Sequence, residues 1–344
     1  MNQFWNKKYW KNKYVQAAIV LLCLVVGAAL FWHGQLNAPK TGGDGKTVLF
    51  RVAPGMSASD IADRLKKDGL IDNVAAFRTE AKVSGLEKSL QAGTYRLTRG
   101  MSVRQIIDVF AKGRVEQIAF TVPEGYTVTQ IADLVENMHF GKKTRFLEMA
   151  RNYTPYDYMR TDDANVVYKA EGFLFPSTYY LAADAGEEQI LAMMTAEFNR
   201  QLTPEKRQRL SAQGLTVRQW LTMGSLVEKE AQVETDRPVI AGVFYNRLRE
   251  DMPLQSCATI QYILGYPKAE LTVEDTKRPS PYNTYLHPGL PPGPIANPGA
   301  AALEAALNPA PTEYKFFVVQ ANGAHRFSRT YDEHLQAIQQ VSGQ

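Results

Sequence analysis

The longest uninterrupted apolar run of the chain lies close to its start. Residues 15–32 read VQAAIVLLCLVVGAALFW, carry no charge and contain Gln16 as their only polar side chain. A run of this length is sufficient for one membrane-spanning helix. It exceeds the apolar core of about 7–15 residues found in cleaved signal peptides, and no small-x-small cleavage site follows it. The pattern therefore predicts an uncleaved transmembrane helix over residues 14–33.

After a Gly-rich polar linker over residues 34–46, one pattern of apolar and polar positions occurs three times. The copies are FRVAPGMSASDIADRL (50–65), YRLTRGMSVRQIIDVF (95–110) and FTVPEGYTVTQIADLV (120–135). In each copy, residue types alternate over a short strand and a glycine marks a turn. Ser or Thr then precedes apolar residues at helical spacing, as at a helix N-cap. Three strand–turn–helix units are therefore predicted.

The first two copies, together with a helix expected around residues 74–83, resemble a LysM-type module. The resemblance implies binding of glycans that contain N-acetylglucosamine. It defines residues 47–118 as a LysM-like region and residues 119–165 as a connecting α/β segment. The alternative is a small α+β spacer that binds no ligand.

Residues 166–344 hold dense clusters of aromatic and carboxylate residues. EGFLFPSTYYL begins with Glu171 and packs several aromatic residues behind it, an environment that raises a carboxyl pKa. TVRQWLTMGSLVEKEA predicts a helix that begins at an N-cap, Thr216, and carries Glu228 and Glu230 near its end. These two carboxylates are about 200° apart around a helix, so they cannot both face one cleft. Periodicity does not decide which of them faces inward.

The clusters that follow predict a further helix, a long loop and a C-terminal strand and helix. Thr235 is expected as the N-cap of a helix with Pro238 in its first turn. Residues 280–299 contain six prolines and three glycines, which excludes a helix or a central strand. We predict that this loop forms a rigid polar groove wall. A strand over residues 314–320 and a helix carrying His334 complete the chain, which is assigned to the α+β class.

Charge and composition narrow the possible partners. Lys7, Lys8, Lys11 and Lys13 precede the apolar run, and setting them aside leaves 35 basic and 35 acidic residues. The positive-inside rule then gives a cytoplasmic tail over residues 1–13 and an extracytoplasmic remainder on the cell membrane. An electroneutral remainder argues against a nucleic-acid partner. The two cysteines and five histidines show no metal-binding spacing, so no metal or other cofactor is expected.

Six motifs in order make the chain similar to the YceG-like family of endolytic murein transglycosylases. The motifs are EGFLFPSTYYL, SLVEKEA, FYNRL, LQS, SPYNTYLHPGLPPGPIANPG and HRFSRTYDEH. The resemblance implies a membrane-anchored lytic transglycosylase that cuts peptidoglycan glycan strands at internal MurNAc–GlcNAc linkages. It also implies a 1,6-anhydro product and a role in ending strand growth beside peptidoglycan synthases. The catalytic acid of the family is the second Glu of E-K-E, which is Glu230 here.

The supporting site is expected to consist of polar side chains from the same motifs. The candidates for substrate contacts are Glu171, Glu228, Gln255, Tyr282, Asn283 and Tyr285. Glu228 is also a candidate for a purely orienting role, and Asn246 and Arg247 are as compatible with structural roles. Family members can carry Asp where this chain has Cys257, so the resemblance assigns no role to that position.

Two other functions remain open from the sequence. One is a hydrolytic muramidase that uses Glu171 and Glu230 as a carboxylate pair. The other is a non-catalytic membrane scaffold that binds peptidoglycan.

Overall fold

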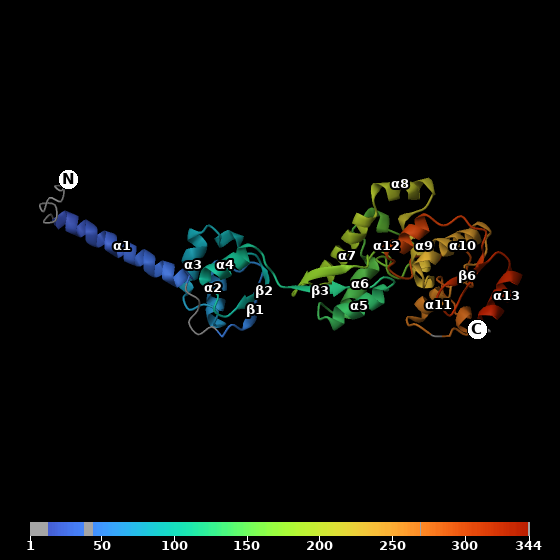
Figure 1. Cartoon of the computed structure of the whole chain (residues 1–344), viewed down its shortest axis with the longest axis horizontal. Helices are drawn as coiled ribbons and strands as arrows, with labels where there is room; N and C mark the ends of the chain where they lie inside the picture. The colour runs from blue at the N-terminus through green and yellow to red at the C-terminus, as the bar shows by residue number, and fades with distance from the viewer. Residues whose placement is uncertain (1–12, 38–43, 269, 343–344) are drawn as a thin grey trace. The chain divides into compact units, whose positions relative to one another are not determined.

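The computed structural model describes residues 13–37, 44–268 and 270–342 (Figure 1). The predicted tail up to residue 12 and residues 38–43 of the predicted linker lie outside this part. The chain divides into two compact units, and helices and strands of both make the protein α+β. The first unit runs to Ile118 and includes Ala182–Asp184, and the second comprises Ala119–Leu181 and Ala185–Gln344.

The predicted apolar helix is α1 (Lys13–Asn37), which continues four residues beyond the expected end at residue 33. Its segment Lys13–Phe31 has a mean hydropathy of 2.4 and is long and apolar enough to cross a membrane. Near its C-terminal end, Leu36 is 8% exposed and belongs to the core of the first unit, where α1 packs against α3 (Val74–Val83) and α4 (Val103–Ala111). By length and composition alone, α1 fits a membrane anchor or a signal sequence.

The first unit combines a two-stranded antiparallel sheet with three further helices (Figure 1). Phe50 on one strand lies opposite Tyr95 on the other, and both rings pack against Phe110, with ring centroids 5.8 and 4.7 Å away. The elements are β1 (Thr47–Val52), α2 (Ala58–Lys67), α3 (Val74–Val83), the 3-10 turn η1 (Glu87–Ser89), β2 (Gly93–Thr98) and α4 (Val103–Ala111).

The structure confirms the three predicted strand–turn–helix units. Ser57, Ser102 and Thr127 are the N-caps of α2, α4 and α5 (Val128–Asn137), and each closes a capping box with the residue three positions later. A capping box satisfies two N–H groups that would otherwise lack partners at a helix start. Each turn also uses a glycine with positive φ; these are Gly55 at 82°, Gly100 at 106° and Gly125 at 74°.

The second unit contains two hydrophobic cores. One core contains residues of strands β3 and β4, which pair in a two-stranded sheet. The other core contains residues of α9 and α12, which pack together. The elements are β3 (Gln117–Thr121), α5 (Val128–Asn137), α6 (Lys143–Asn152), η2 (Asp157–Met159), β4 (Thr178–Ala182), α7 (Glu187–Gln201), α8 (Pro204–Ala212), α9 (Val217–Glu230), η3 (Glu234–Asp236), α10 (Arg237–Arg249), α11 (Cys257–Leu264), η4 (Asp275–Lys277), α12 (Ala300–Leu307), β5 (Phe316–Val319), β6 (His325–Ser328) and α13 (Tyr331–Ser342).

Residues 119–165, predicted as a connecting segment, share a core with the residues that follow them. Phe120, Ile131 and Phe146 belong to the same buried cluster as Leu174 and Met194. Both segments therefore lie in one compact unit of the structure.

The Pro-rich loop is free of helix and strand over residues 279–299, all of which the structure describes, as predicted. The expected C-terminal strand and helix are present as β5 and α13, and β6 is an additional strand that pairs antiparallel with β5. The predicted cap at Thr235 is wrong, because α10 begins one residue later with Asp236 as its N-cap.

Candidate active site

Glu230 is the last residue of α9, and its side chain is half-buried. The Oγ of Ser256 donates a hydrogen bond to its carboxylate. Ser256 is itself held in place because its backbone N–H donates to the Oγ1 of Thr284 over 3.0 Å. Thr284 belongs to the Pro-rich loop, so this loop positions the side chain that contacts Glu230.

Burial raises the pKa of Glu230 above its usual value. The hydrogen bond from Ser256 and the nearby charges of His325 and Arg247 act in the opposite direction, because they stabilise the carboxylate. The net direction is upward. The folded protein thus favours the protonated form of Glu230 more than water does.

Glu230 lines a pocket of about 430 Å³ within the second unit. Four further residues discussed in the sequence analysis as possible site residues line it, namely Arg247, Gln255, Cys257 and Tyr285. The Sγ of Cys257 lies 3.1 Å from the hydroxyl of Tyr285. Aromatic side chains of the C-terminal segment, including Phe316, Phe317 and Tyr331, complete the wall. The pocket therefore combines one carboxyl group with apolar and aromatic surfaces.

Arg247 contributes a positive charge to this pocket while holding the backbone around it. Its Nε donates to the carbonyl oxygen of Lys315 over 2.6 Å, and its Nη1 donates to that of Leu254 over 2.7 Å. Its guanidinium also lies over the ring of Phe316, 5.3 Å from the centroid. The neighbouring Asn246 donates to the carbonyl oxygens of Thr312 and Tyr314 instead, which is a structural position.

Two histidines also line the pocket. The Nδ1 of His325 lies 3.0 Å from the Oδ2 of Asp236, which also accepts the backbone N–H of His325. Asp236 thus orients His325 rather than capping α10 with its side chain. The ring of His334 stacks on Phe316 with centroids 5.3 Å apart. Its Nδ1 is buried and has no hydrogen-bond partner within the described chain.

Glu171 lies outside this pocket. It is 1% exposed, and its carboxylate accepts hydrogen bonds from the backbone N–H of Val128, the Nδ2 of Asn297 and the hydroxyl of Tyr262. Burial raises the pKa of Glu171 to about 8. Through these hydrogen bonds Glu171 joins α5 to the Pro-rich loop. It does not form a carboxylate pair with Glu230 in the pocket.

Glu228 also points away from the pocket. Its Oε2 accepts the backbone N–H of Gly299, the N-cap of α12, over 3.0 Å, and its Oε1 lies 3.9 Å from the Nη2 of Arg237. Burial raises the pKa of Glu228, and the charge of Glu124 adds to this effect. The two carboxylates of the E-K-E triplet thus face different surroundings, as the helix geometry predicts, and Glu228 docks α12 onto α9.

The remaining candidates divide between structure and surface. Asn283 is fully buried; its Nδ2 donates to the carbonyl oxygens of Thr276 and Arg278, and its Oδ1 accepts from the N–H of Tyr285. Tyr282 is buried and packs against Tyr262, with ring centroids 5.1 Å apart, in a second pocket. Gln255 is exposed at the rim of the Glu230 pocket and adopts a positive φ of 48°.

Sequence reasoning did not select Ser256, His325 or His334 as site residues. Ser256 stands in the LQS motif, and both histidines stand in HRFSRTYDEH. These motifs contain several polar side chains close together, and helical periodicity does not explain their positions. This clustering is the sequence signal that could have identified the three residues.

The arrangement defines a candidate site for general acid–base catalysis. General acid–base catalysis uses a positioned group whose pKa is shifted by its surroundings, and Glu230 meets this description because burial raises its pKa and Ser256 contacts its carboxylate. In the part of the chain that the structure describes, no group of three or more His, Cys, Asp or Glu side chains is placed to hold a metal ion.

Comparison with known proteins identifies the family: the sequence profile of the YceG-like family matches residues 50–340, and the chain belongs to this family. The chain is 36% identical to the endolytic murein transglycosylase of Bacillus subtilis (strain 168) over 327 residues, which are 91% of this chain and 90% of that protein. The endolytic murein transglycosylase of Streptococcus pneumoniae serotype 2 (strain D39 / NCTC 7466) is 31% identical, with 94% of this chain and 65% of the relative aligned.

A solved structure shows the same fold. The crystal structure of a YceG-like protein from Listeria monocytogenes superposes with a TM-score of 0.60 at 34% sequence identity. The superposition covers 86% of this chain and all of that chain.

Proposed function

We propose that this protein is a membrane-anchored lytic transglycosylase that cuts peptidoglycan glycan strands at internal MurNAc–GlcNAc linkages. The observation that carries the proposal is the position of Glu230 in a partly apolar pocket that raises its pKa. The names of the relatives from Bacillus and Streptococcus support the same activity.

The proposed reaction needs one carboxyl group. Protonated Glu230 gives its proton to the glycosidic oxygen, and the bond from this oxygen to C1 of the muramyl residue breaks. The 6-hydroxyl of the same residue attacks C1, and the Glu230 carboxylate takes the hydroxyl proton. No water is consumed, and the product carries a 1,6-anhydro end. Proton transfer of this kind contributes roughly 10²–10⁴-fold to a rate.

The absence of Glu171 from the pocket supports a reaction with one carboxyl group. Retaining and inverting hydrolases normally place two carboxyl groups on either side of the scissile bond. Glu171 uses its oxygens for buried hydrogen bonds to Val128 and Asn297. The proposed lyase mechanism requires no such second group.

The proposal places α1 in the cell membrane as a single span, with its N-terminus in the cytoplasm and the chain after it outside. The length and hydropathy of Lys13–Phe31 support an anchor. Cleavage of nascent strands near the membrane would end their elongation, with peptidoglycan synthases as the expected neighbours. In the first unit, α2 and α3 lie in sequence between the antiparallel strands β1 and β2, an order that supports the LysM-like assignment. Glycan binding by this unit is part of the proposal.

The test is to incubate the purified full chain in detergent with glycan strands and to analyse the products by mass spectrometry. Anhydro ends, lighter by one water than reducing ends, are expected. Glu230→Gln keeps the size of the side chain and removes the transferable proton, so it should lower the rate by roughly 10²–10⁴-fold. Glu228→Gln is the matched control two residues earlier on α9 and should retain most activity.

Other outcomes would support the competing functions. Reducing ends instead of anhydro ends would indicate a muramidase. Binding of strands without release of any product would indicate a non-catalytic scaffold. Wild-type rates in Glu230→Gln would remove Glu230 from the mechanism.

A further inference from the structure

A second pocket, of about 450 Å³, lies in the same unit beside the Glu230 pocket. Lys229 lines both pockets, and the start of α11 contributes Cys257 to one and Ala258 to the other. The proposed acid–base step uses no residue of the second pocket. Its volume falls within the range of about 300–1,000 Å³ typical of small-ligand sites.

The walls of this pocket combine aromatic rings with side-chain amides. Four tyrosines contribute from three separate segments of the chain, together with two glutamines. These residues are Tyr168, Tyr262, Tyr266, Tyr282, Gln130 and Gln261. Aromatic faces pack against the apolar faces of pyranose rings, while amides bond to hydroxyl and N-acetyl groups. Among the lining residues that the structure describes, Lys229 alone carries a charge, so the lining suits an uncharged, polyhydroxylated ligand.

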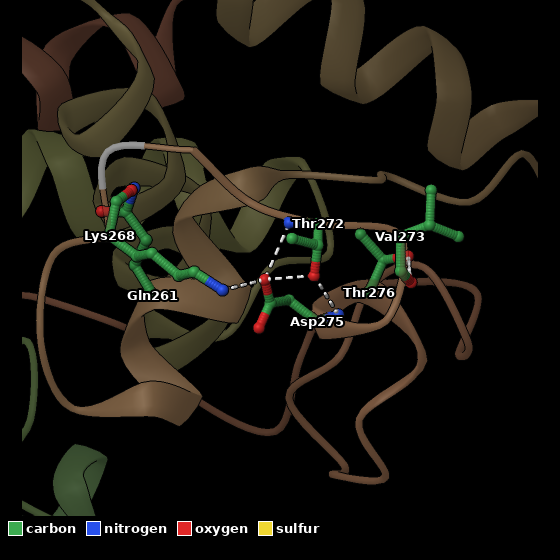
Figure 2. Close-up of polar contacts among 6 residues, drawn as sticks. All are labelled: Gln261, Lys268, Thr272, Val273, Asp275 and Thr276. Carbon is green, nitrogen blue, oxygen red and sulfur yellow. Dashed lines mark hydrogen bonds and ion pairs between the residues drawn. The ribbon is translucent and has the colours of Figure 1, made fainter.

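A polar cluster links side chains of the segments that follow α11 (Figure 2). Lys268 forms an ion pair with Asp275, whose Oδ2 also accepts the backbone N–H and the hydroxyl of Thr272, each over 2.7 Å. The hydrogen bond from Lys268 and those from Thr272 hold the pKa of Asp275 well below its usual range. Gln261 donates to the carbonyl oxygen of Lys268 over 3.4 Å and ties this cluster back to α11.

This cluster fixes the ends of the segment that carries Tyr266 and Pro267, both of which line the pocket. Tyr266 nevertheless remains 57% exposed, so its ring is accessible to a ligand. A wall that is ordered before binding lowers the entropic cost of holding a ligand.

We propose that this second pocket is a glycan subsite, which binds sugar rings of the same strand whose scissile linkage lies at Glu230. The shared residue Lys229 makes the two pockets neighbours, so one extended strand can occupy both. The inference rests on the proposed function. It implies that the enzyme holds a strand at some distance from the bond it cuts, which favours cleavage within long strands over cleavage of short fragments.

The test compares substrates of different length. Tyr266→Ala removes an exposed ring from the second pocket. It should raise KM for long strands roughly 3–10-fold, which is the change expected when one stacking contact is lost, and it should leave kcat unchanged. For the shortest fragment that is still cut, KM should stay the same. Thr129→Trp fills the pocket from α5 and should have the same selective effect. Tyr180→Ala, which removes a ring that is 62% exposed on β4, is the matched control.

An unchanged KM for long strands in both variants would overturn the subsite, as would an equal rise for the shortest fragment. A binding measurement separates this result from failure of the proposed function. Glu230→Gln and the double variant Glu230→Gln/Tyr266→Ala are titrated with long glycan strands as full chains. Weaker binding by the double variant supports the subsite even if the wild type cuts nothing, and equal binding refutes it.

Discussion

The hydroxyl of Ser256 donates a hydrogen bond to the carboxylate of Glu230 across a sequence separation of 26 residues. The contact joins the last residue of α9 to the N-cap of α11. It opposes the effect of burial, because it stabilises the charged form that burial disfavours. Ser256 therefore sets how readily Glu230 gives up its proton, and it also fixes the direction of the side chain.

Replacing Ser256 by Ala should change the pH dependence of the reaction. Activity requires protonated Glu230, so it falls as pH rises through the pKa of this group. Loss of the hydrogen bond to the carboxylate raises that pKa further, and the alkaline decline should move to higher pH. The rate at the optimum should fall roughly 10–100-fold if the contact also positions the acid, since a hydrogen bond to a charged group contributes about 1.5–3 kcal/mol.

The measurement is kcat/KM for glycan cleavage as a function of pH. Ser256→Thr retains a hydroxyl and should keep the decline near its wild-type position. A shift of the decline to lower pH in Ser256→Ala would contradict the proposed relationship between the two residues.

Alkylation of Cys257 should block the Glu230 pocket. The thiol is exposed, lines the pocket and lies 3.1 Å from the hydroxyl of Tyr285. A maleimide adduct at this position would occupy space that the substrate needs, so nearly all activity should be lost. The experiment uses a Cys23→Ser background, because the thiol of Cys23 on α1 is also exposed.

Cys257→Ser in the same background should retain activity and should no longer be inhibited by the maleimide, because it lacks the reactive thiol. Glycan strands added beforehand should slow the modification. Full activity of the quantitatively alkylated protein would show that the substrate does not enter this pocket.

Local structure could be predicted from the sequence because its causes are local. The caps Ser57, Ser102, Thr127 and Thr216 act on N–H groups three residues away, so a short window contains the whole interaction. The same holds for the Pro-rich loop, whose composition excludes regular structure without reference to any other segment.

The partners of polar side chains depend instead on distant segments. Glu171 was predicted from its aromatic neighbours alone, and the structure shows that its hydrogen bonds reach residues 43 and 126 positions away. A carboxylate beside aromatic residues looks the same in sequence whether it faces a groove or a buried helix start. The role of Ser256 likewise appears only when α9 and α11 meet, because its partner Glu230 is 26 positions away.

Stability should depend on pH through Glu171. Burial raises its pKa to about 8 in the folded protein, from an ordinary value of 4.5. Between these values the folded state binds more protons than the unfolded state, so the free energy of unfolding falls as pH rises. The slope from this group is at most about 1.4 kcal/mol per pH unit. Thermal unfolding of the wild type should therefore show a higher Tm near pH 5 than near pH 8.

Glu171→Gln should flatten this dependence, because the amide does not titrate. Its oxygen can accept from Val128 and Asn297, and its NH2 group can donate to the hydroxyl of Tyr262. The comparison of slopes between variant and wild type isolates this group from all others that titrate. Equal slopes in the two proteins would show that Glu171 does not carry the effect.

Asn297→Ala should destabilise the second unit without touching the Glu230 pocket. The fully buried Asn297 accepts the N–H of Leu174 over 2.8 Å and donates to Glu171 and to the carbonyl oxygen of Tyr126. Leaving the buried N–H of Leu174 unpaired costs about 1–3 kcal/mol, and Glu171 loses a donor as well.

Urea unfolding can be followed through Trp220, which is buried in this unit. Asn322→Ala removes an exposed hydrogen bond to the N–H of Ala324 and should cost much less. If the two variants unfold at the same urea concentration, Asn297 does not join these segments as the structure indicates.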